Sequence, residues 1–147
     1  MVKFEHVTFG TNSSCGIIPR RSTSGAAGYD FVSPERVVIA PGEKKKIATG
    51  IKAKMSPGIG LFIIPRSSMG IKHDLHLAND VALIDSDYYN NPDNDGNIII
   101  CLHNYGRSEE IVEIGDRVAQ GIFVGYYIVE DDDTSEERVG GIGSTGV

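Results

Sequence analysis

The chain has 147 residues, 40% of them hydrophobic, and a formal net charge of −6 at pH 7. That length is typical of one domain, which buries about 70% of its unfolded surface and folds without a disulfide or a structural metal. The acidic balance excludes nonspecific nucleic-acid binding, which requires a basic stripe, and the longest apolar run, GIFVGYYIV, is too short to span a bilayer.

The cysteines and the N-terminal residues indicate the compartment. Cys15 and Cys101 lie far apart and belong to no CxxC pair, and the four histidines form no spaced ligand set with them, which argues against zinc. The first ten residues alternate apolar and polar side chains and lack the basic and apolar regions of a signal peptide. We therefore expect a soluble protein of the reducing cytoplasm.

Short apolar or alternating segments bounded by Gly, Pro, Asn or Asp predict strands along most of the chain. They are VKFEHVTF (2–9), RVVIA (36–40), KKIATGIKAKM (45–55), GLFIIP (60–65), NIIICLHN (97–104), EEIVEI (109–114) and RVAQGIFVGYYIV (117–129). No stretch predicts a helix of three turns, and the 18 glycines suit many tight turns. The pattern predicts an all-β sandwich or barrel.

The sequence has two runs of like charge, and we predict a different role for each. The lysines at 44–46 are typical of a solvated surface. The acidic run EDDDTSEE (130–137) follows the last predicted strand and precedes a glycine-rich tail, RVGGIGSTGV (138–147). We therefore expect a β-domain over 1–129, and a flexible acidic linker with a mobile C-terminal arm over 130–147.

Two short stretches in the first half of the chain have the chemistry of a binding site. In SGAAGYDF (24–31), small residues allow a tight turn that leaves Asp30 facing a cation through water or an arginine directly; a plain turn fits equally well. In PRSSMG (65–70), Arg66 offers a planar fork of donors for phosphate, and the two serines add hydroxyl and backbone donors. The alternative is a surface arginine followed by an N-cap serine.

A third stretch, ALIDSDYYNNPDNDGN (82–97), begins with a predicted strand that delivers Asp85 at its end. A carboxylate there is held rigidly and still touches water, as a general base requires, and Tyr88 lies near enough to flank the same hollow. The alternative is a solvated hairpin with Asp85 and Asp87 capping its turn. For Asp87 we predict that turn or surface role.

Two further stretches lie near the C-terminus. In GDRVAQGIF (115–123), strand alternation puts Arg117 and Gln120 on opposite faces unless a bulge intervenes, so one of them is expected to be structural. In GGIGSTG (140–146), successive backbone N–H groups can converge on an anion, although a lone glycine-rich tail is also typical of disorder.

Taken in order, the five stretches resemble the five motifs of the homotrimeric dUTPase family. The matching segments, which span residues 26–146, are AGYD, PRSSMG, IDSDY, GDRVAQ and GGIGSTG. Five ordered motifs are far more specific than any one of them. The resemblance implies jelly-roll β-barrel subunits in a homotrimer, active sites at the subunit interfaces, and a C-terminal arm that closes over a site built by other subunits.

The resemblance also implies an activity. It is the hydrolysis of dUTP to dUMP and pyrophosphate by water attack on the α-phosphorus, which keeps uracil out of DNA and supplies dUMP for thymidylate synthesis. Asp85 matches the carboxylate that activates water, and Tyr88 matches the ring that packs against deoxyribose. Asp30 matches the residue that reaches Mg²⁺ through water, the ion itself being carried mainly by the triphosphate.

The remaining substrate-binding positions follow from the same resemblance, and Arg117 is expected to support them through an ion pair. Those for the phosphates are Arg66, Ser67, Ser68, Gln120 and Arg138; those for the uracil edge are Asn79, Leu83, Ile84 and Ile99; those of the closing arm are Ile142, Gly143 and Ser144.

The chain departs from the family pattern at four places. Ala82 stands where Gly is usual, and Arg138 lies one residue closer to the glycines than usual. YNNPDNDGN (89–97) replaces a short Arg-Gly turn, and we expect it to form a lengthened hairpin tip. Ile142 takes the place of the Phe that stacks on uracil, so aromatic stacking on that side is lost.

Two other functions stay open at this point. A dCTP deaminase has a related fold and an Arg-Ser-Ser segment, but its chemistry needs a glutamate near the third motif, and residues 85–108 contain none. A phage-type dUTPase, working in an infected bacterial host, would use the nucleotide pocket as a switch for a regulatory protein partner. The loop at 89–97 is the segment that would serve such a partner.

Overall fold

The computed structural model describes residues 1–144, which form short strands and little helix. The strands are β1 (Val2–His6), β2 (Tyr29–Val32), β3 (Val37–Ile39), β4 (Lys44–Ala48), β5 (Ile51–Met55), β6 (Ile59–Ile64), β7 (Leu75–Leu77), β8 (Ala82–Ile84), β9 (Ile99–Asn104), β10 (Glu110–Val112) and β11 (Arg117–Gly125). The helices are α1 (Ser67–His73) and the 3-10 turn η1 (Ser86–Tyr88). The predicted all-β class with little helix is confirmed.

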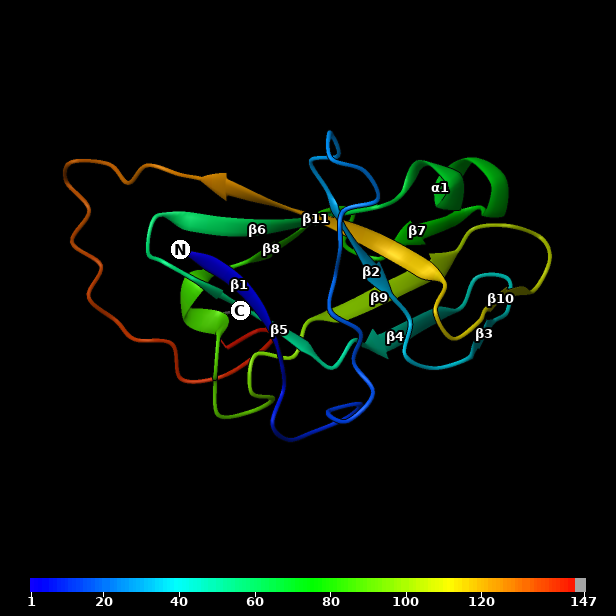
Figure 1. The fold of residues 1–147 in the computed structure, drawn as a ribbon, viewed down its shortest axis with the longest axis horizontal. Helices are drawn as coiled ribbons and strands as arrows, with labels where there is room; N and C mark the ends of the chain where they lie inside the picture. Colours follow the sequence, from blue (N-terminus) through cyan, green and yellow to red (C-terminus); the bar gives the residue numbers. More distant parts are fainter. Residues whose placement is uncertain (145–147) are drawn as a thin grey trace.

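The strands pair antiparallel in four sheets within the described residues. The two larger sheets have the orders β2-β11-β6-β8 and β4-β9-β7, and the smaller ones are the pairs β1-β5 and β10-β3. Figure 1 shows the long β11 crossing the centre of the molecule, with β6 and β2 beside it and β9 and β4 below. The sheet that contains β6 and β8 positions the residues predicted to act on a substrate.

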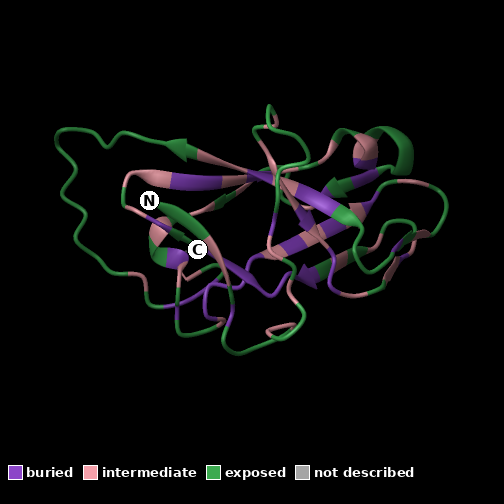
Figure 2. Ribbon diagram, in the orientation of Figure 1, coloured by how far each residue is buried: buried purple, intermediate pink, exposed green. Residues whose placement is uncertain are grey.

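One apolar core joins the larger sheets. Every second residue of β9 is buried, as strand alternation requires when one face packs inward. The fully buried members of the core come from both sheets and their neighbours, and include Phe31, Ile39, Ile47, Ile51, Leu61, Ile63, Ile98, Ile100, Leu102 and Val118. Figure 2 shows the buried residues concentrated along these inner strands, while the long segment after β11 is exposed.

The predicted strands differ from the structure in several places. The segment 45–55 is two strands, because the chain turns at Gly50, which adopts a φ of +71° that favours glycine. The strands β2 and β7 have four and three residues and lie among polar or glycine-rich neighbours, so their apolar pattern is too short to stand out. Residues 126–129 are exposed and form no strand.

The loop at 89–97 is a packed part of the structure, so the prediction of a hairpin tip is wrong. Its flanking strands do not pair with each other, since β8 pairs with β6, and β9 pairs with β4 and β7. The side chain of Asp95 is buried and forms an ion pair of 2.9 Å with the buried Lys52 on β5. It also accepts the N–H of Thr8 at 2.6 Å. These contacts hold the loop against β5 and the residues after β1.

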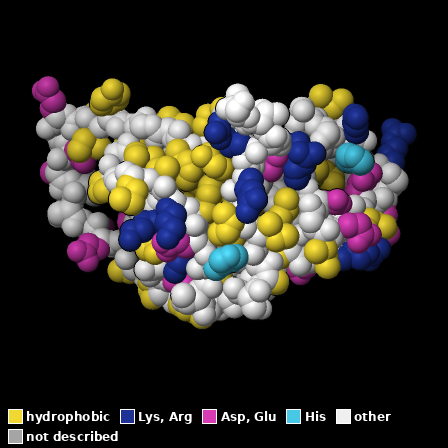
Figure 3. All heavy atoms as spheres, in the orientation of Figure 1, with side chains coloured by type: hydrophobic (Ala, Val, Ile, Leu, Met, Phe, Trp, Pro, Cys, Tyr) yellow, Lys and Arg dark blue, Asp and Glu magenta, His cyan; other side chains and the backbone are white. Residues whose placement is uncertain are grey.

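The surface carries mixed charge. Figure 3 shows Lys and Arg separated by acidic, apolar and other groups on the face in view, with no continuous basic stripe there. In the lysine run, Lys44 and Lys46 are exposed and Lys45 pairs with Glu43 at 2.7 Å. Among residues 1–144, no helix is both long and apolar enough to cross a bilayer.

Candidate active site

Asp85 stands at the start of the turn η1, directly after β8. The strand is fixed by its pairing with β6, in which Ile84 lies opposite Leu61. The exposed Asp85 carboxylate accepts a hydrogen bond from Arg138 Nη2 at 2.7 Å, and Asp87 accepts one from Arg138 Nε at 2.8 Å. Neither carboxylate caps the turn. Asp87 lies exposed in the turn, as predicted for it, and its carboxylate also contacts the C-terminal arm.

Tyr88 is buried below Asp85, with 6% of its surface exposed. Its hydroxyl donates to the carbonyl of Asn97 at 3.0 Å and accepts from Asn94 Nδ2 at 2.8 Å. Burial raises the pKa of the Tyr88 phenol above its ordinary value of 10.0, so the ring stays neutral at physiological pH. Its orientation is thus fixed by the loop at 89–97, and the Arg138 guanidinium lies 5.7 Å from the ring centre.

A hollow of about 280 Å³ lies beside these groups. It brings together the positions predicted for the uracil edge, the sugar, the general base and the arm. Its lining includes Asn79, Leu83, Ile84, Asp85, Tyr88, Ile99, Arg138, Ile142 and Gly143. Ser144 lines the adjoining hollow with Asp85, and its hydroxyl lies 3.5 Å from Arg138 Nη1. The opening is large enough for a nucleobase and polar enough at its rim to orient one.

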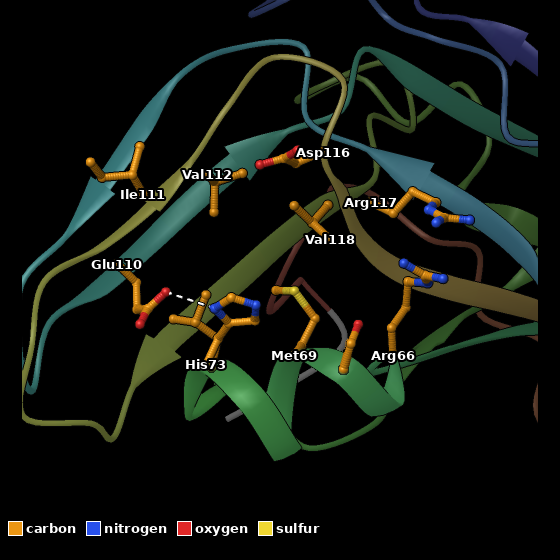
Figure 4. A pocket seen from close by; sticks show the side chains of 11 residues that line it. Arg66, Met69, His73, Glu110, Ile111, Val112, Asp116, Arg117 and Val118 are labelled. Carbon is orange, nitrogen blue, oxygen red and sulfur yellow. Dashed lines mark hydrogen bonds and ion pairs between the residues drawn. The ribbon is translucent and has the colours of Figure 1, made fainter.

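A second group of predicted residues surrounds Asp30 on β2. Arg66 Nε lies 3.0 Å from one carboxylate oxygen of Asp30, and Arg117 Nη1 lies 3.5 Å from the other. Figure 4 shows Arg66 and Arg117 at one end of a hollow between α1 and β10, at whose far end His73 Nδ1 lies within hydrogen-bond distance of Glu110, at 3.0 Å. Arg117 has the ion pair predicted for it. Ser68 lines the same hollow, and Ser67 is exposed beside it.

A bulge explains why Arg117 and Gln120 both belong to this group. The pairing of β11 with β2 shifts between Arg117 and Ala119, so simple alternation does not hold there. Gln120 pairs with Asp30 across the strands and donates to the carbonyl of Pro65 at 3.2 Å, next to Arg66. A Cβ at Gly28 would lie 2.7 Å from Gln120 Oε1, so a larger residue there would displace the Gln120 amide from its observed position.

The two groups lie at opposite ends of β6. Ile84 pairs with Leu61, Asp85 continues in the direction away from Arg66, and Arg66 follows the other end of the strand. At about 3.3 Å per residue, the backbones of Asp85 and Arg66 lie roughly 15 to 20 Å apart. A single chain therefore does not bring Arg66 and the residues beside it to Asp85, whereas Arg138, on the arm, does contact Asp85.

Comparison with known proteins supports the resemblance of the five motifs to the dUTPase family. The family model described as dUTPase matches residues 15–146, nearly nine-tenths of the sequence. The chain belongs to the dUTPase family. Among curated proteins, it is 46% identical over 145 residues to the deoxyuridine 5'-triphosphate nucleotidohydrolase of Lactococcus lactis, which covers 97% of this chain and 96% of that relative.

Other relatives agree. The corresponding protein of Hahella chejuensis is 38% identical over 137 residues, covering 88% of this dUTPase and 86% of its own length. Among solved structures, the dUTPase of Streptococcus mutans is 40% identical with a TM-score of 0.77, covering 86% of this chain and 98% of its own. The dUTPase of Staphylococcus bacteriophage 80alpha, at 23% identity, shares the fold with a TM-score of 0.74. The jelly-roll-like β fold is confirmed.

The contacts of the arm go beyond those predicted from the sequence. Within the chain Arg138 contacts Asp85, and an arm that closes over a site built by other subunits stays a prediction. The sequence also gave no sign of Asp93, which accepts the N–H of Gly141 at 2.7 Å, or of Asn94, which contacts Tyr88. Their only signal was the unusual length of the loop at 89–97.

Proposed function

We propose that this dUTPase hydrolyses dUTP to dUMP and pyrophosphate at a site completed by a second copy of the chain, with Asp85 as the general base. The observation that carries the proposal is the meeting of Asp85 and Tyr88 beside one hollow with Asn79. In the cytoplasm that the free cysteines favour, the reaction keeps uracil out of DNA and supplies dUMP for thymidylate synthesis.

In the first step, Asp85 holds a water in line with the α-phosphorus and accepts its proton as the oxygen attacks. Its position supports this role, because the carboxylate is exposed to solvent and fixed between β8 and η1. Pyrophosphate leaves as the α-phosphoryl group forms its new bond to oxygen. The Tyr88 ring, held by two hydrogen bonds, packs on deoxyribose and leaves no room for a 2′-hydroxyl.

Base recognition depends mainly on backbone groups near Leu83, Ile84 and Ile99, with the side chain of Asn79 at the rim. All four residues line the same hollow. Backbone donors and acceptors held in strands have fixed directions, so they distinguish the edge of uracil from that of cytosine. The exposed Ile142 lies on the arm side of the hollow and covers the base when the arm closes.

The phosphates bind at Arg66, Ser67, Ser68 and Gln120, and the terminal one also at Arg138. The chain carries a charge of −6, so local cations must outweigh its overall repulsion of a nucleotide triphosphate. When bound, Mg²⁺ supplies further positive charge to the phosphate oxygens. Among residues 1–144, no three His, Cys, Asp or Glu side chains gather to hold an ion. In this proposal the ion arrives on the triphosphate. Asp30 would contact it through water.

A second copy supplies what one chain lacks. Arg66 and Asp85 lie at opposite ends of β6, so a homotrimer that places Arg66 of one copy beside Asp85 of the next completes the site. Exposed apolar side chains near both ends support such contacts, among them Val81, Leu83, Ile111 and Tyr127. The relatives favour neither alternative function, and the loop at 89–97 uses its surface for contacts within the chain.

A pyrophosphate-release assay with dUTP, dTTP, dCTP and UTP, each with and without Mg²⁺, tests this function. We expect turnover of dUTP alone, faster with Mg²⁺, because Tyr88 excludes UTP and the backbone of β8 excludes dCTP. Comparable turnover of dCTP or UTP would contradict the assignment of these two residue groups.

A further inference from the structure

The loop at 89–97 makes contacts that none of the five motifs accounts for. Its Asp93 carboxylate accepts the N–H of Gly141, in the C-terminal arm, at 2.7 Å. The Asp93 side chain has no other hydrogen bond or ion pair among residues 1–144, although its own backbone N–H donates to Asn91 at 3.1 Å. Its side chain is therefore free to serve the arm, while its backbone belongs to the loop.

The arm packs closely against this loop. A Cβ added at Gly140 would lie 2.6 Å from Asp93 Oδ2, so that carboxylate would have to move, whereas one at Gly141 would make ordinary contact with Asn91 Oδ1 at 3.4 Å. Both glycines are buried, whereas the next residue, Ile142, is 72% exposed. The pair of glycines thus fits the surface of the loop.

Contacts that do not involve the arm hold the loop in place. Asn91 Nδ2 donates to the carbonyl of Tyr88 at 2.9 Å, and its side-chain oxygen accepts the backbone N–H groups of Asp93 and Asn94. Lys52 and Asp95 anchor the loop to β5 through their buried ion pair. A preorganised surface loses little conformational entropy when a flexible segment binds to it.

We propose that the loop at 89–97 is the docking site for the C-terminal arm, with Asp93 as the positioning residue that holds Gly141. The inference rests on the proposed function in one respect, since the docked arm places Arg138 and Ile142 at the nucleotide site. Two hydrogen bonds at the start of the arm complete the docking, because Arg138 donates to Asp85 and to Asp87.

Limited proteolysis tests the docking without any nucleotide. Trypsin cuts after Arg138 only when the arm is released, because the docked Arg138 side chain is 9% exposed. Asp93→Ala removes one hydrogen bond to a charged acceptor, so we expect cleavage there to become about tenfold faster. Asp93→Asn keeps an oxygen that accepts the Gly141 N–H and should restore most of the protection. Asp131→Ala, in the exposed linker, is the matched control and should change nothing.

A double-mutant cycle separates docking from a general effect on the loop. Gly140→Ala should release the arm in the wild type, since its methyl group would collide with Asp93, and should do much less in the Asp93→Ala background. The affinity for the analogue dUpNHpp should fall about tenfold in Asp93→Ala. Unchanged proteolysis in Asp93→Ala, or additive effects in the cycle, would overturn the proposal. If the wild type fails to hydrolyse dUTP, the proposed function fails while the proteolysis result still stands.

Discussion

Arg138 bridges Asp85 and Asp87 with two nitrogens of one guanidinium, at 2.7 and 2.8 Å. The arm thus places its cation on the proposed general base, and under the proposed function the triphosphate takes that cation over when it binds. Arg138→Lys keeps the charge but loses the planar fork, so we expect kcat/KM to fall about tenfold, and about a hundredfold for Arg138→Ala. Arg107→Ala, at an exposed arginine, is the control for steady-state kinetics. Equal kcat/KM values for Arg138→Ala and the control would show that Arg138 does not act in the site.

The two carboxylates have different predicted roles. Asp85→Asn keeps size and shape but cannot accept the proton, so kcat should fall about a hundred- to ten-thousandfold while dUTP affinity changes little. Asp87→Asn loses only an exposed ion pair and should cost no more than about fivefold. Steady-state kinetics and nucleotide titration of the two variants side by side measure both. An active Asp85→Asn with an inactive Asp87→Asn would move the base assignment by two residues.

The sequence predicted which residues lie together where their neighbourhood depends on local order in the chain, and their roles stay predictions. Asp85, Tyr88 and Asn79 line one hollow because a short strand and a turn follow each other directly. The relation of Gln120 to Arg117 could not be predicted, since a bulge depends on pairing with β2, which is distant in sequence.

The prediction of a hairpin tip at 89–97 was wrong for a similar reason. Its Asn, Asp, Pro and Gly residues have the composition of a solvated turn. Whether Asp95 is exposed or buried depends on Lys52, 43 residues earlier, and a pattern of residues within the loop carries no information about that partner. The strands β2 and β7 were missed because three or four residues do not establish a period.

The ion pair between Lys52 and Asp95 predicts how stability depends on pH. Burial alone would raise the pKa of Asp95, but the N–H and hydroxyl of Thr8 and the Lys52 ammonium outweigh it, so the pKa lies below its ordinary 3.8. The stabilisation is therefore complete above that value and is lost as pH falls through the lower, folded-state pKa.

Asp95→Asn tests this link. It leaves the Lys52 charge buried without a partner, so the free energy of unfolding near neutral pH should fall by about 3 to 5 kcal/mol. Urea unfolding between about pH 5 and about pH 2 should show a flatter acid dependence than in the wild type. Asp131→Asn, in the exposed linker, should follow the wild-type curve. An Asp95→Asn curve parallel to that of the wild type would contradict the assigned pKa direction.

Ile142 provides a test of the arm as a cover for the base. Its side chain is 72% exposed at the edge of the hollow. Ile142→Phe restores a ring on the uracil face and should tighten nucleotide binding by about 1 kcal/mol. Calorimetric titration with dUpNHpp measures the difference. An unchanged or weaker affinity would mean that the hollow has repacked around isoleucine.

The most direct test of a shared site is complementation between two inactive variants. Arg66→Ala chains keep Asp85, and Asp85→Asn chains keep Arg66, at opposite ends of β6. After joint refolding at equal amounts, random assembly should give about a quarter of the sites both intact residues, and about a quarter of wild-type dUTP turnover. Each variant refolded alone should stay inactive. A mixture no more active than the separate variants would show that Arg66 and Asp85 do not act together across two copies, and would contradict the account.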